Sequence, residues 1–595
     1  MKKILLLLTF IFISTATWAV KAYPFPVTVQ QSDGTQLTIL IRGDEHYHWY
    51  TTEDGVILCR KGNDYYIALV NSNGDLEATT QLAHNKDKRS EAEQQLVAKQ
   101  NKVAFKSSIG AKRARRKASV EDEIYSDASY FPHKGSPKAV VILAEFQDTP
   151  FTVTNPRRSF NQYLNGKGRP QNYDNQEDYN YSSVGQYFAD MSFNQFTPQF
   201  DIYGPVKLPH NSNYYGENSS NATDINFFDL VKDACTLMND SLDFSKYDSN
   251  NDGLVDLVYV VYAGYAESMT GNSADCIWPK SGYHNYGTFD GKQVARYGVN
   301  NELNGNPPYT GINGIGLFCH EFSHTLGLPD LYQSTQEHCD NNQEMEFWDL
   351  MDSGEYCKNG WYPAPYTAWE REAMGWMEIE TLTSEAQIQL TPIQEGGKAY
   401  RIVNDNAPNE YYIIENIQER GWYDAKSSGK SIRGHGMLVY HVDYNKDLFR
   451  LSSLPNSVKG HPRMTVVAAD GLLQSYDNSA DRDGFYLQMN GDPFPGISGV
   501  TSLNDDMKRQ DGKSMLFTYT GKLNKPIFNI KEDENGVITF DFLKDFSGTG
   551  ISKPIYTHEE QDSRIFTLDG RYAGTDINTL PKGIYIMGKK KVYVK

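Results

Sequence analysis

The chain has 595 residues and a formal net charge of −18, with 57 Lys and Arg against 75 Asp and Glu. Its length exceeds what one hydrophobic core supports, so two or more domains are expected. The acidic balance argues against a nucleic-acid-binding protein, whose affinity rests on neutralising phosphates, and suits an exported protein that binds cations. Hydrophobic residues at 39% and charged residues at 22% are typical of globular proteins, and 13% aromatic residues favour β-rich structure.

Residues 1–22 predict a secretory signal peptide. A basic start, MKK, precedes the apolar run ILLLLTFIFI, and small residues follow, with Ala19 and Ala22 as candidate cleavage positions. The run is too short for a stable membrane span, and no later stretch is long and apolar enough to be one. We therefore expect a mature protein outside the cytoplasm.

Residues 23–117 predict a propeptide that consists of a β-rich unit and a basic linker. Strand-like runs such as TQLTILIRG and DYYIALV alternate with turn signals such as SDG and EDG. The chain then becomes charged, is helix-prone at first, and ends in the strongly basic KRARRK (112–117), an exposed target for trypsin-like enzymes. Cys59 could bind a zinc ion as a thiolate and so keep an enzyme inactive. A cysteine that is simply buried in a strand is the more frequent alternative.

Residues 118–380 mix helices with strands and predict an α/β catalytic domain. KAVVILAEFQD (138–148) has the continuous apolar pattern of a buried strand, and YSSVGQYFADMSFNQ (181–195) predicts a helix. Residues 381–546 return to strands and turns and predict a β-sandwich-like domain packed on the catalytic unit. Residues 547–595 begin with a linker and predict a small C-terminal β module.

The stretch YDSNNDGLVD (247–256) predicts a structural calcium loop. It matches the first nine positions of an EF-hand, with glycine at position 6. The expected oxygen ligands are Asp248, Asn250, Asp252, Leu254 (through its carbonyl) and Asp256. Position 12 is Tyr259 instead of Glu, so the loop needs a carboxylate from elsewhere, and Asp243 and Glu267 are candidates. An Asx-rich turn without metal is the alternative.

HEFSHTLGLPD (320–330) is the most specific motif in the chain. On a helix, His320 and His324 lie on one face with Cβ atoms about 5–6 Å apart, so both can bind one Zn²⁺. Zinc lowers the pKa of a bound water towards neutrality, and Glu321 is placed to take its proton as general base. A random HExxH is expected in roughly one or two of a hundred chains of this length.

The third zinc ligand is expected from the end of the same motif. Gly327 can adopt the left-handed conformation that ends a helix, and the chain can then bring Asp330 back to the metal. A distant carboxylate is the alternative, and Glu415 in YYIIEN is one candidate.

HEFSHTLGLPD resembles the extended zinc motif of immune inhibitor A-like secreted metalloproteases, in the metzincin clan. FWDLMDSG (347–354) looks like the Met-turn of that clan, with Met351 beneath the zinc site. VGQYFADMSFNQF, NEYYIIEN and HGMLVYHVDY are also similar to segments of the family. The resemblance implies a zincin-like catalytic fold, the same zinc ligands and the same base. Where several metzincins have tyrosine two residues after the methionine, this chain has Ser353, so Tyr356 is the nearest candidate for oxyanion support.

FTLDGRYAGTDINTLPKGIYIMGKKKVYVK (566–595) resembles the β module at the C-termini of proteins exported by the type IX secretion system of Bacteroidetes. The resemblance implies contact with secretion machinery and a protein that is surface-attached or released. A plain surface β-hairpin unit is the alternative, and would leave the protein periplasmic.

These patterns together predict a secreted zinc endopeptidase that hydrolyses proteins or peptides. One rival is a non-catalytic exported protein that uses calcium to bind a host or polysaccharide ligand. Glu321 argues against it, because a purely structural zinc site has no use for a base at that position. A zinc hydrolase that acts on a non-peptide bond is the second rival.

Overall fold

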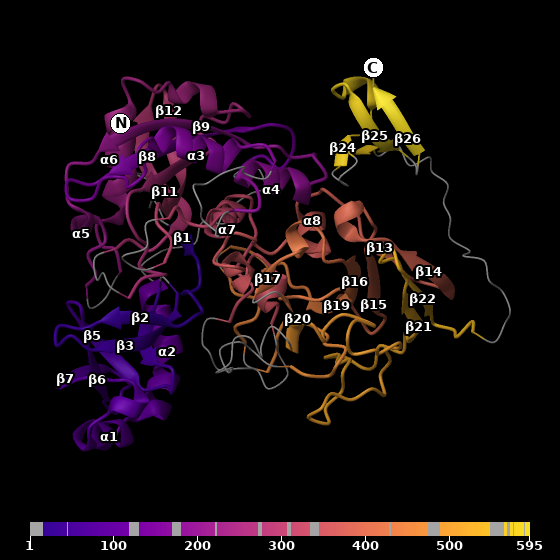
Figure 1. The fold of residues 1–595 in the computed structure, drawn as a ribbon, viewed down its shortest axis with the longest axis horizontal. Helices are drawn as coiled ribbons and strands as arrows, with labels where there is room; N and C mark the ends of the chain where they lie inside the picture. Colours follow the sequence, from indigo (N-terminus) through magenta and orange to yellow (C-terminus); the bar gives the residue numbers. More distant parts are fainter. Residues whose placement is uncertain are drawn as a thin grey trace, which may run out of the picture.

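The computed structural model describes residues 16–44, 46–117, 130–168, 180–219, 223–271, 276–305, 311–333, 344–427, 430–451, 453–458, 460–473, 488–547, 565–567, 572–574, 576–587 and 590–594. In these parts the chain forms a multidomain, β-rich protein with few helices (Figure 1). Within the same ranges, no helix has the length and apolar character that a membrane crossing requires. Most of the predicted signal peptide, residues 1–15, lies outside the described residues.

The N-terminal unit is an antiparallel sheet in which each strand pairs with the next along the chain. Its strands are β2 (Val27–Gln30), β3 (Gln36–Gly43), β4 (His48–Thr52), β5 (Ile57–Lys61), β6 (Asp64–Val70) and β7 (Leu76–Leu82). Two helices follow, α1 (Glu91–Ala98) and α2 (Lys102–Lys117). The basic stretch expected as a linker is therefore helical up to residue 117. Phe105 and Ile109, four positions apart, bury one face of α2 against Trp49 of the sheet, which explains the difference.

A second six-stranded sheet forms the centre of the predicted catalytic domain, in the order β1-β11-β12-β10-β8-β9. The strands are β1 (Ala16–Ala19), β8 (Lys138–Glu145), β9 (Gln199–Lys207), β10 (Val258–Tyr262), β11 (Lys280–Phe289) and β12 (Lys292–Asn301). β9, β8, β10 and β12 are mutually parallel. β11 runs antiparallel to β12, and β1 pairs antiparallel with the outer edge of β11.

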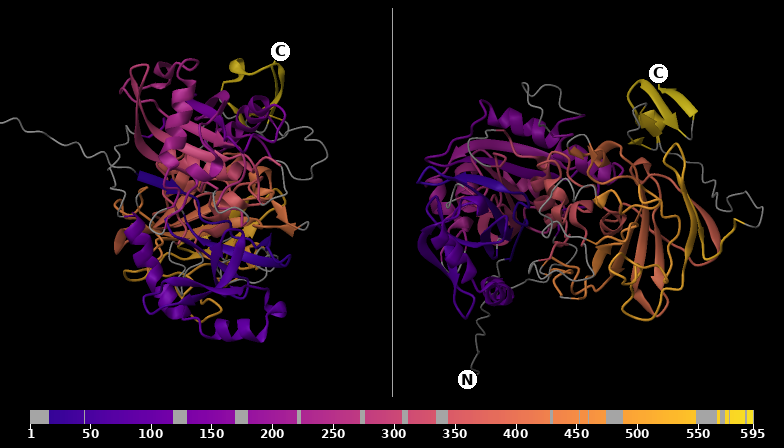
Figure 2. Two further views of the ribbon diagram at one scale, coloured as in Figure 1. Left: turned by 90° about the vertical axis from the view of Figure 1, so that its left-hand side faces the viewer. Right: turned by 60° about the horizontal axis from the view of Figure 1, so that its bottom comes forward.

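Helices cover both faces of this sheet, which explains why β8 reads as a continuous apolar run. Val140 and Ile142 pack in a cluster that includes α6 (Phe227–Met238), whereas Val141 and Leu143 pack with α4 (Val184–Met191) on the other face. The remaining helices of this region are α3 (Pro156–Asn165), α5 (Ser212–Tyr215), α7 (Ile315–Thr325) and α8 (Ala368–Ala373). The two views in Figure 2 show the sheet between its helices.

The region after residue 380 is again built from strands. One sheet has the order β13-β15-β16-β19-β20 and another the order β14-β22-β21, and both contribute to one hydrophobic cluster. The strands are β13 (Glu380–Thr381), β14 (Ala386–Leu390), β15 (Tyr400–Asn404), β16 (Ala407–Ile417), β19 (Gly436–Asp443), β20 (Met464–Val466), β21 (Ile527–Glu532) and β22 (Ile538–Phe542). A two-stranded ribbon, β17 (Lys426–Ser427) and β18 (Lys430–Ser431), lies between β16 and β19 in the chain.

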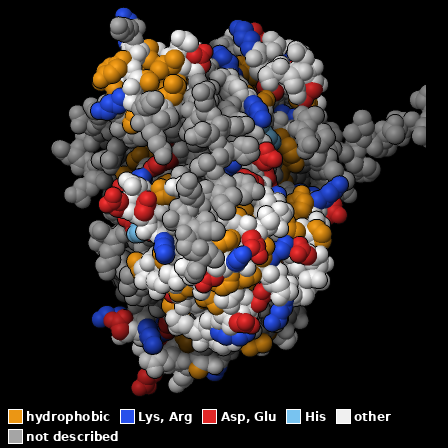
Figure 3. All heavy atoms as spheres, turned by 90° about the vertical axis from the view of Figure 1, so that its right-hand side faces the viewer, with side chains coloured by type: hydrophobic (Ala, Val, Ile, Leu, Met, Phe, Trp, Pro, Cys, Tyr) orange, Lys and Arg blue, Asp and Glu red, His pale blue; other side chains and the backbone are white. Residues whose placement is uncertain are grey.

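The C-terminal module is a four-stranded antiparallel sheet in the order β24-β23-β25-β26. Its strands are β23 (Ile565–Thr567), β24 (Tyr572–Gly574), β25 (Gly583–Met587) and β26 (Lys590–Val594). Ile584 and Tyr593 expose 40% and 67% of their surface. Apolar side chains gather at the top left of Figure 3, where this module lies, whereas acidic and basic side chains are interspersed over the rest of that face.

Helix α7 approaches the loop after residue 345 so closely that only glycine fits at Gly316. A Cβ there would lie 1.9 Å from the carbonyl oxygen of Glu355 and 3.1 Å from the Cα of Gly360. The Gly316 N–H donates to the Gly360 carbonyl at 2.9 Å. This contact fixes the distance between the helix and the loop, both of which contribute to the site described below.

We predict that Gly316→Ala destabilises the protein by about 1–3 kcal/mol, because helix and loop must separate to admit the methyl group. Thermal unfolding followed by circular dichroism measures the loss. Gly185→Ala on α4 is the comparison, since its added Cβ would come no closer than 3.0 Å to another atom, the Leu164 carbonyl oxygen, and should cost less than the 1.9 Å clash at Gly316. Equal melting temperatures for the two variants would contradict the close approach.

Candidate metal centre

Helix α7 places the motif residues at the centre of the molecule. It spans Ile315–Thr325, and His320, Glu321 and His324 are at most 1% exposed. The helix ends at Gly327, whose φ of +100° is left-handed, as the sequence predicts. The chain then reverses and returns Asp330, which is 6% exposed, towards the helix.

The two histidines and Asp330 converge on one point. The Nε2 atoms of His320 and His324 lie 3.1 and 3.3 Å from Oδ1 of Asp330. In the described parts of the chain, these residues are the only group of three or more His, Cys, Asp or Glu side chains with ligand atoms so placed, all within 4.8 Å of one another. The structure thus brings together the three residues that the sequence predicts as ligands.

Backbone carbonyls fix the orientation of both imidazole rings. Nδ1 of His320 donates to the Leu350 carbonyl at 2.9 Å, and Nδ1 of His324 donates to the Leu328 carbonyl at 2.8 Å. Because a carbonyl only accepts, each Nδ1 carries the hydrogen and each Nε2 keeps a lone pair. Outer contacts of this kind orient metal-binding histidines.

The polar atoms that face the convergence point have no hydrogen-bond partner. They are Nε2 of His320, Nε2 of His324 and Oδ1 of Asp330, and all three are buried. Buried polar atoms without a partner are costly, and a bound cation would satisfy all three. Two neutral imidazoles and one carboxylate, with a position left for water, fit the donor set of a catalytic zinc site.

Glu321 lies beside this group and is fully buried. Burial raises the pKa of its carboxyl to about 7, and the neighbouring His324 and His320 act in the opposite direction. Its Oε1 accepts a hydrogen bond from the backbone N–H of Val20 at 3.1 Å, whereas Oε2 has no partner. A carboxyl group with a pKa near neutrality suits a general base.

A loop from residue 345 to 360 forms the floor of the site. Met351 is fully buried, and its carbonyl accepts from the N–H of Leu331, next to Asp330. Glu355 is also buried, with Oε2 2.7 Å from Nδ1 of His320. Burial raises the pKa of Glu355 to about 7, and His320 opposes the rise. No sequence pattern singles out Glu355, because only the fold brings it to His320.

Tyr356 follows in the same loop, in a short 3₁₀ helix over Ser353–Tyr356. Its hydroxyl donates to the backbone carbonyl of Lys21 at 2.7 Å. The candidate for oxyanion support therefore contacts the carbonyl of an extended segment that lies across the site. That segment belongs to the end of the predicted signal peptide, and no local sequence pattern indicates its position.

The predicted calcium loop is held by its own hydrogen bonds and by a lysine. Asp248 accepts from the N–H groups of residues 252 and 253, and its Oδ2 lies 2.6 Å from Nζ of Lys292. Asp256 accepts from the Ser249 N–H at 3.1 Å. The two candidate carboxylates from outside the loop have other partners: Asp243 accepts a hydrogen bond from the Ser245 N–H, and Glu267 accepts one from Asn218. The calcium site stays a prediction, and the Lys292 ion pair must open for the ion to bind.

The other candidate ligands lie elsewhere. Cys59 is on β5, opposite Tyr66 of β6, and packs against the small core of the N-terminal unit. Its thiol is thus not part of the histidine group, and the hypothesis of a cysteine held on zinc is wrong for this conformation. Glu415 on β16 accepts from the Ala368 N–H at 3.4 Å and is not part of the group either.

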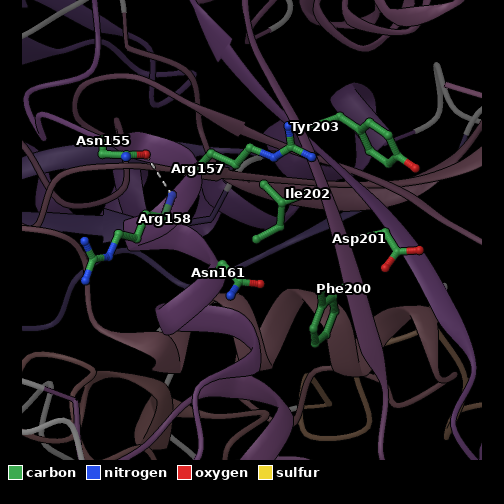
Figure 4. Close-up of a pocket in the computed structure, with 8 residues that line it drawn as sticks. All are labelled: Asn155, Arg157, Arg158, Asn161, Phe200, Asp201, Ile202 and Tyr203. Atoms are coloured by element: carbon green, nitrogen blue, oxygen red, sulfur yellow. Dashed lines mark hydrogen bonds between the residues drawn. The ribbon is translucent and has the colours of Figure 1, made fainter. Parts of the chain in front are cut away.

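A surface hollow of about 620 Å³ lies between α3 and β9, away from the metal centre. Figure 4 shows its lining, in which Arg157 and Arg158 come from the helix and Asp201 and Tyr203 from the strand. None of the motif residues lines it.

Comparison with known proteins agrees with this geometry. Residues 127–377 match the family described as immune inhibitor A peptidase M6, catalytic domain. The chain is 24% identical over 425 residues to the pre-pro-metalloprotease PrtV of Vibrio cholerae serotype O1, which covers 63% of this chain and 43% of that protein. It is 26% identical over 202 residues to immune inhibitor A of Bacillus thuringiensis subsp. alesti, which covers 28% of each. These matches support a metalloprotease, although the chain spans less than half the length of these relatives.

We predict that Glu355→Ala weakens zinc binding about 10- to 100-fold, because His320 loses a contact that orients its ring. Competition with a chromogenic chelator measures the affinity. Glu415→Ala is the control, since it removes another buried carboxylate and also tests the rival third ligand. Loss of zinc in the Glu415 variant, with normal affinity in the Glu355 variant, would reverse the assignment.

Proposed function

We propose that the protein is an exported zinc endopeptidase of the metzincin type that cleaves proteins or peptides, with Glu321 as general base. One observation carries the proposal: two buried imidazole nitrogens and one carboxylate oxygen converge without partners beside a buried glutamate. A structural zinc site has no use for that glutamate. The match of residues 127–377 to a peptidase family supports hydrolysis of peptide bonds over other bonds.

His320, His324 and Asp330 would hold the zinc ion, which supplies Lewis acidity to a peptide carbonyl and lowers the pKa of water. Glu321 accepts the proton of the attacking water, whose oxygen bonds to the carbonyl carbon. The C–N bond then breaks, and Glu321 returns the proton to the leaving amine. The Tyr356 hydroxyl donates to the Lys21 carbonyl in this structure, and in this proposal it donates to a substrate carbonyl instead and holds the peptide in place during the reaction.

The same proposal includes the expected processing and location. The N-terminal unit would act as a propeptide, and the name of the relative PrtV, a pre-pro-metalloprotease, supports such an order. The C-terminal module would serve export through secretion machinery and leave the protein secreted or at the cell surface. Nucleic acid is not expected as a partner, given the net charge of −18.

Calcium at residues 248–256 is the structural cofactor in this proposal. The loop geometry supports it, because Gly253 has a φ of +90° and the side chains of Asp248 and Asp256 are held inward by backbone N–H groups. Binding requires that Lys292 exchange its contact with Asp248 for solvent.

We predict that Glu321→Ala lowers the rate of hydrolysis about 10²- to 10⁴-fold and leaves bound zinc near one per chain. The parent and the Glu321→Ala protein are produced as the full chain. Both are treated with trypsin, which cleaves at the basic stretch 112–117, and the trypsin is then blocked with a serine-protease inhibitor. Zinc is counted by atomic absorption, and cleavage is followed with a denatured protein substrate.

The outcomes separate the proposed function from its rivals. Zinc in both proteins with cleavage only by the parent supports the endopeptidase. Zinc in both with no cleavage by either favours the exported binding protein. Cleavage of an ester but not of any peptide favours a hydrolase of another class.

We predict that zinc alone restores only part of the thermal stability after treatment with EDTA, because calcium must also return to the loop. Melting temperatures are compared for the stripped protein, with zinc, and with zinc plus calcium. Asp248→Asn should abolish the rise in melting temperature that calcium produces, and Asp506→Asn on an exposed loop should not. Full recovery with zinc alone would remove calcium from the proposal.

A further inference from the structure

An extended segment of the chain's own N-terminal region lies across the metal centre. Val20, Lys21 and Ala22 are 0%, 7% and 2% exposed. The Val20 carbonyl accepts from the indole N–H of Trp278 at 3.0 Å, and the strand before it, β1, pairs with the edge of β11 so that Ala19 lies opposite Lys280. Addition of a strand to a sheet edge is a common way to bind an extended peptide.

The contact with Glu321 shows which peptide bond of this segment lies where a substrate bond would be cleaved. Glu321 delivers its proton to the leaving amine in the proposed mechanism, so the backbone nitrogen beside it marks the leaving nitrogen. That nitrogen is the one of Val20, 3.1 Å from Oε1. A substrate bound in the same way would be cleaved at the bond equivalent to Ala19–Val20, and Lys21 would be the second residue after that bond.

The side chain of Lys21 is buried beside the carboxylate of Asp352. Nζ of Lys21 lies 4.0 Å from Oδ1 of Asp352, and the two side chains are 9% and 0% exposed. Asp352 is held rigidly, because its Oδ2 accepts from the Glu346 N–H at 2.8 Å and its Oδ1 accepts from the Ser353 hydroxyl at 3.1 Å. It directly follows Met351, whose carbonyl accepts from the Leu331 N–H next to Asp330, so this contact adjoins the metal centre.

Aromatic contacts hold the rest of the segment against the same loop. The Tyr23 ring packs edge-on against Tyr356, and the Phe25 ring stacks on Phe347 with centroids 5.8 Å apart. The position of Lys21 is thus determined by contacts on both sides of it. When the segment leaves, Asp352 loses the cation beside it, which is unfavourable unless another cation takes its place.

We infer that Asp352 selects substrates that carry lysine or arginine at the second residue after the cleaved bond, and that Lys21 occupies this subsite in the full-length chain, before the predicted signal peptide is removed. The inference rests on the proposed endopeptidase activity and names its substrate class. The chain itself contains a sequence with a basic residue at this position. Cleavage of the Ala111–Lys112 bond would place Arg113 beside Asp352. The basic end of α2 is then a site for cleavage by the enzyme itself.

A peptide mixture of random sequence tests the preference without any substitution. The parent and Glu321→Ala proteins, produced from the full chain and treated alike with trypsin and then inhibitor, are incubated with the mixture. Products are sequenced by mass spectrometry, and the Glu321→Ala products are subtracted as background. We expect Lys and Arg to be enriched at the second position after the cleaved bond.

The role of Asp352 is tested with two peptides that differ only at that position, which holds lysine in one and uncharged norleucine in the other. In the parent we expect kcat/KM to favour the lysine peptide by about 30-fold or more, the lower end for one buried charge pair. In Asp352→Asn the ratio should fall towards one. Asp506→Asn, on the exposed loop, is the matched control and should keep the ratio.

The results separate this inference from the proposed function. Glu321-dependent cleavage with no enrichment of basic residues, or a ratio near one in the parent, overturns the subsite and leaves the endopeptidase intact. Absence of any Glu321-dependent cleavage overturns both. If Asp352→Asn does not fold, the cleavage preference of the parent protein alone decides whether the subsite exists.

Discussion

The convergence of two imidazole nitrogens and one carboxylate oxygen inside the protein is the constraint on which the surrounding structure depends. Three buried polar atoms without hydrogen-bond partners have to be held in place by groups that are themselves satisfied. The carbonyls of Leu328 and Leu350 supply this support for the rings. The Leu331 N–H, bound to the Met351 carbonyl, supplies it for the chain beside Asp330.

This requirement explains why helix and loop pack so tightly. His320 reaches Leu350 and Glu355 only if α7 lies directly against the loop, and Gly316 removes the side chain that would keep them apart. The parallel strands behind the helix, covered on both faces, give it a rigid support. The site is thus built from elements that are distant in sequence but fixed to one another by backbone contacts.

The sequence was sufficient to predict that His320, His324 and Asp330 converge, because their arrangement is local. A helix places residues four apart on one face, and a glycine-ended turn returns Asp330, so the motif contains its own geometry. The buried strand at 138–148 and the helix within 181–195 were also predictable from their apolar patterns. The helix α2 was mistaken for a linker, because its many charges hide the two apolar residues that anchor it.

Other parts of the site could not be predicted, because they join residues far apart in the chain. Val20 and Glu321 are separated by 301 positions, and Tyr356 and Lys21 by 335. Glu355 and Asp352 carry no motif that distinguishes them from other acidic residues. Their roles follow only from burial and from the partners that the fold gives them.

The pairing of β1 with β11 also has a consequence for the behaviour of the protein in solution. Once the predicted signal peptide, which contains β1, has been removed, the N–H and C=O groups on the outer edge of β11 are open to any extended chain, including another copy of the same protein. An edge that pairs with β1 is therefore also an edge at which molecules can associate. β1 would then act as a solubility cover, and concentrated stocks of the full-length chain would keep better than stocks of a chain that lacks residues 1–19.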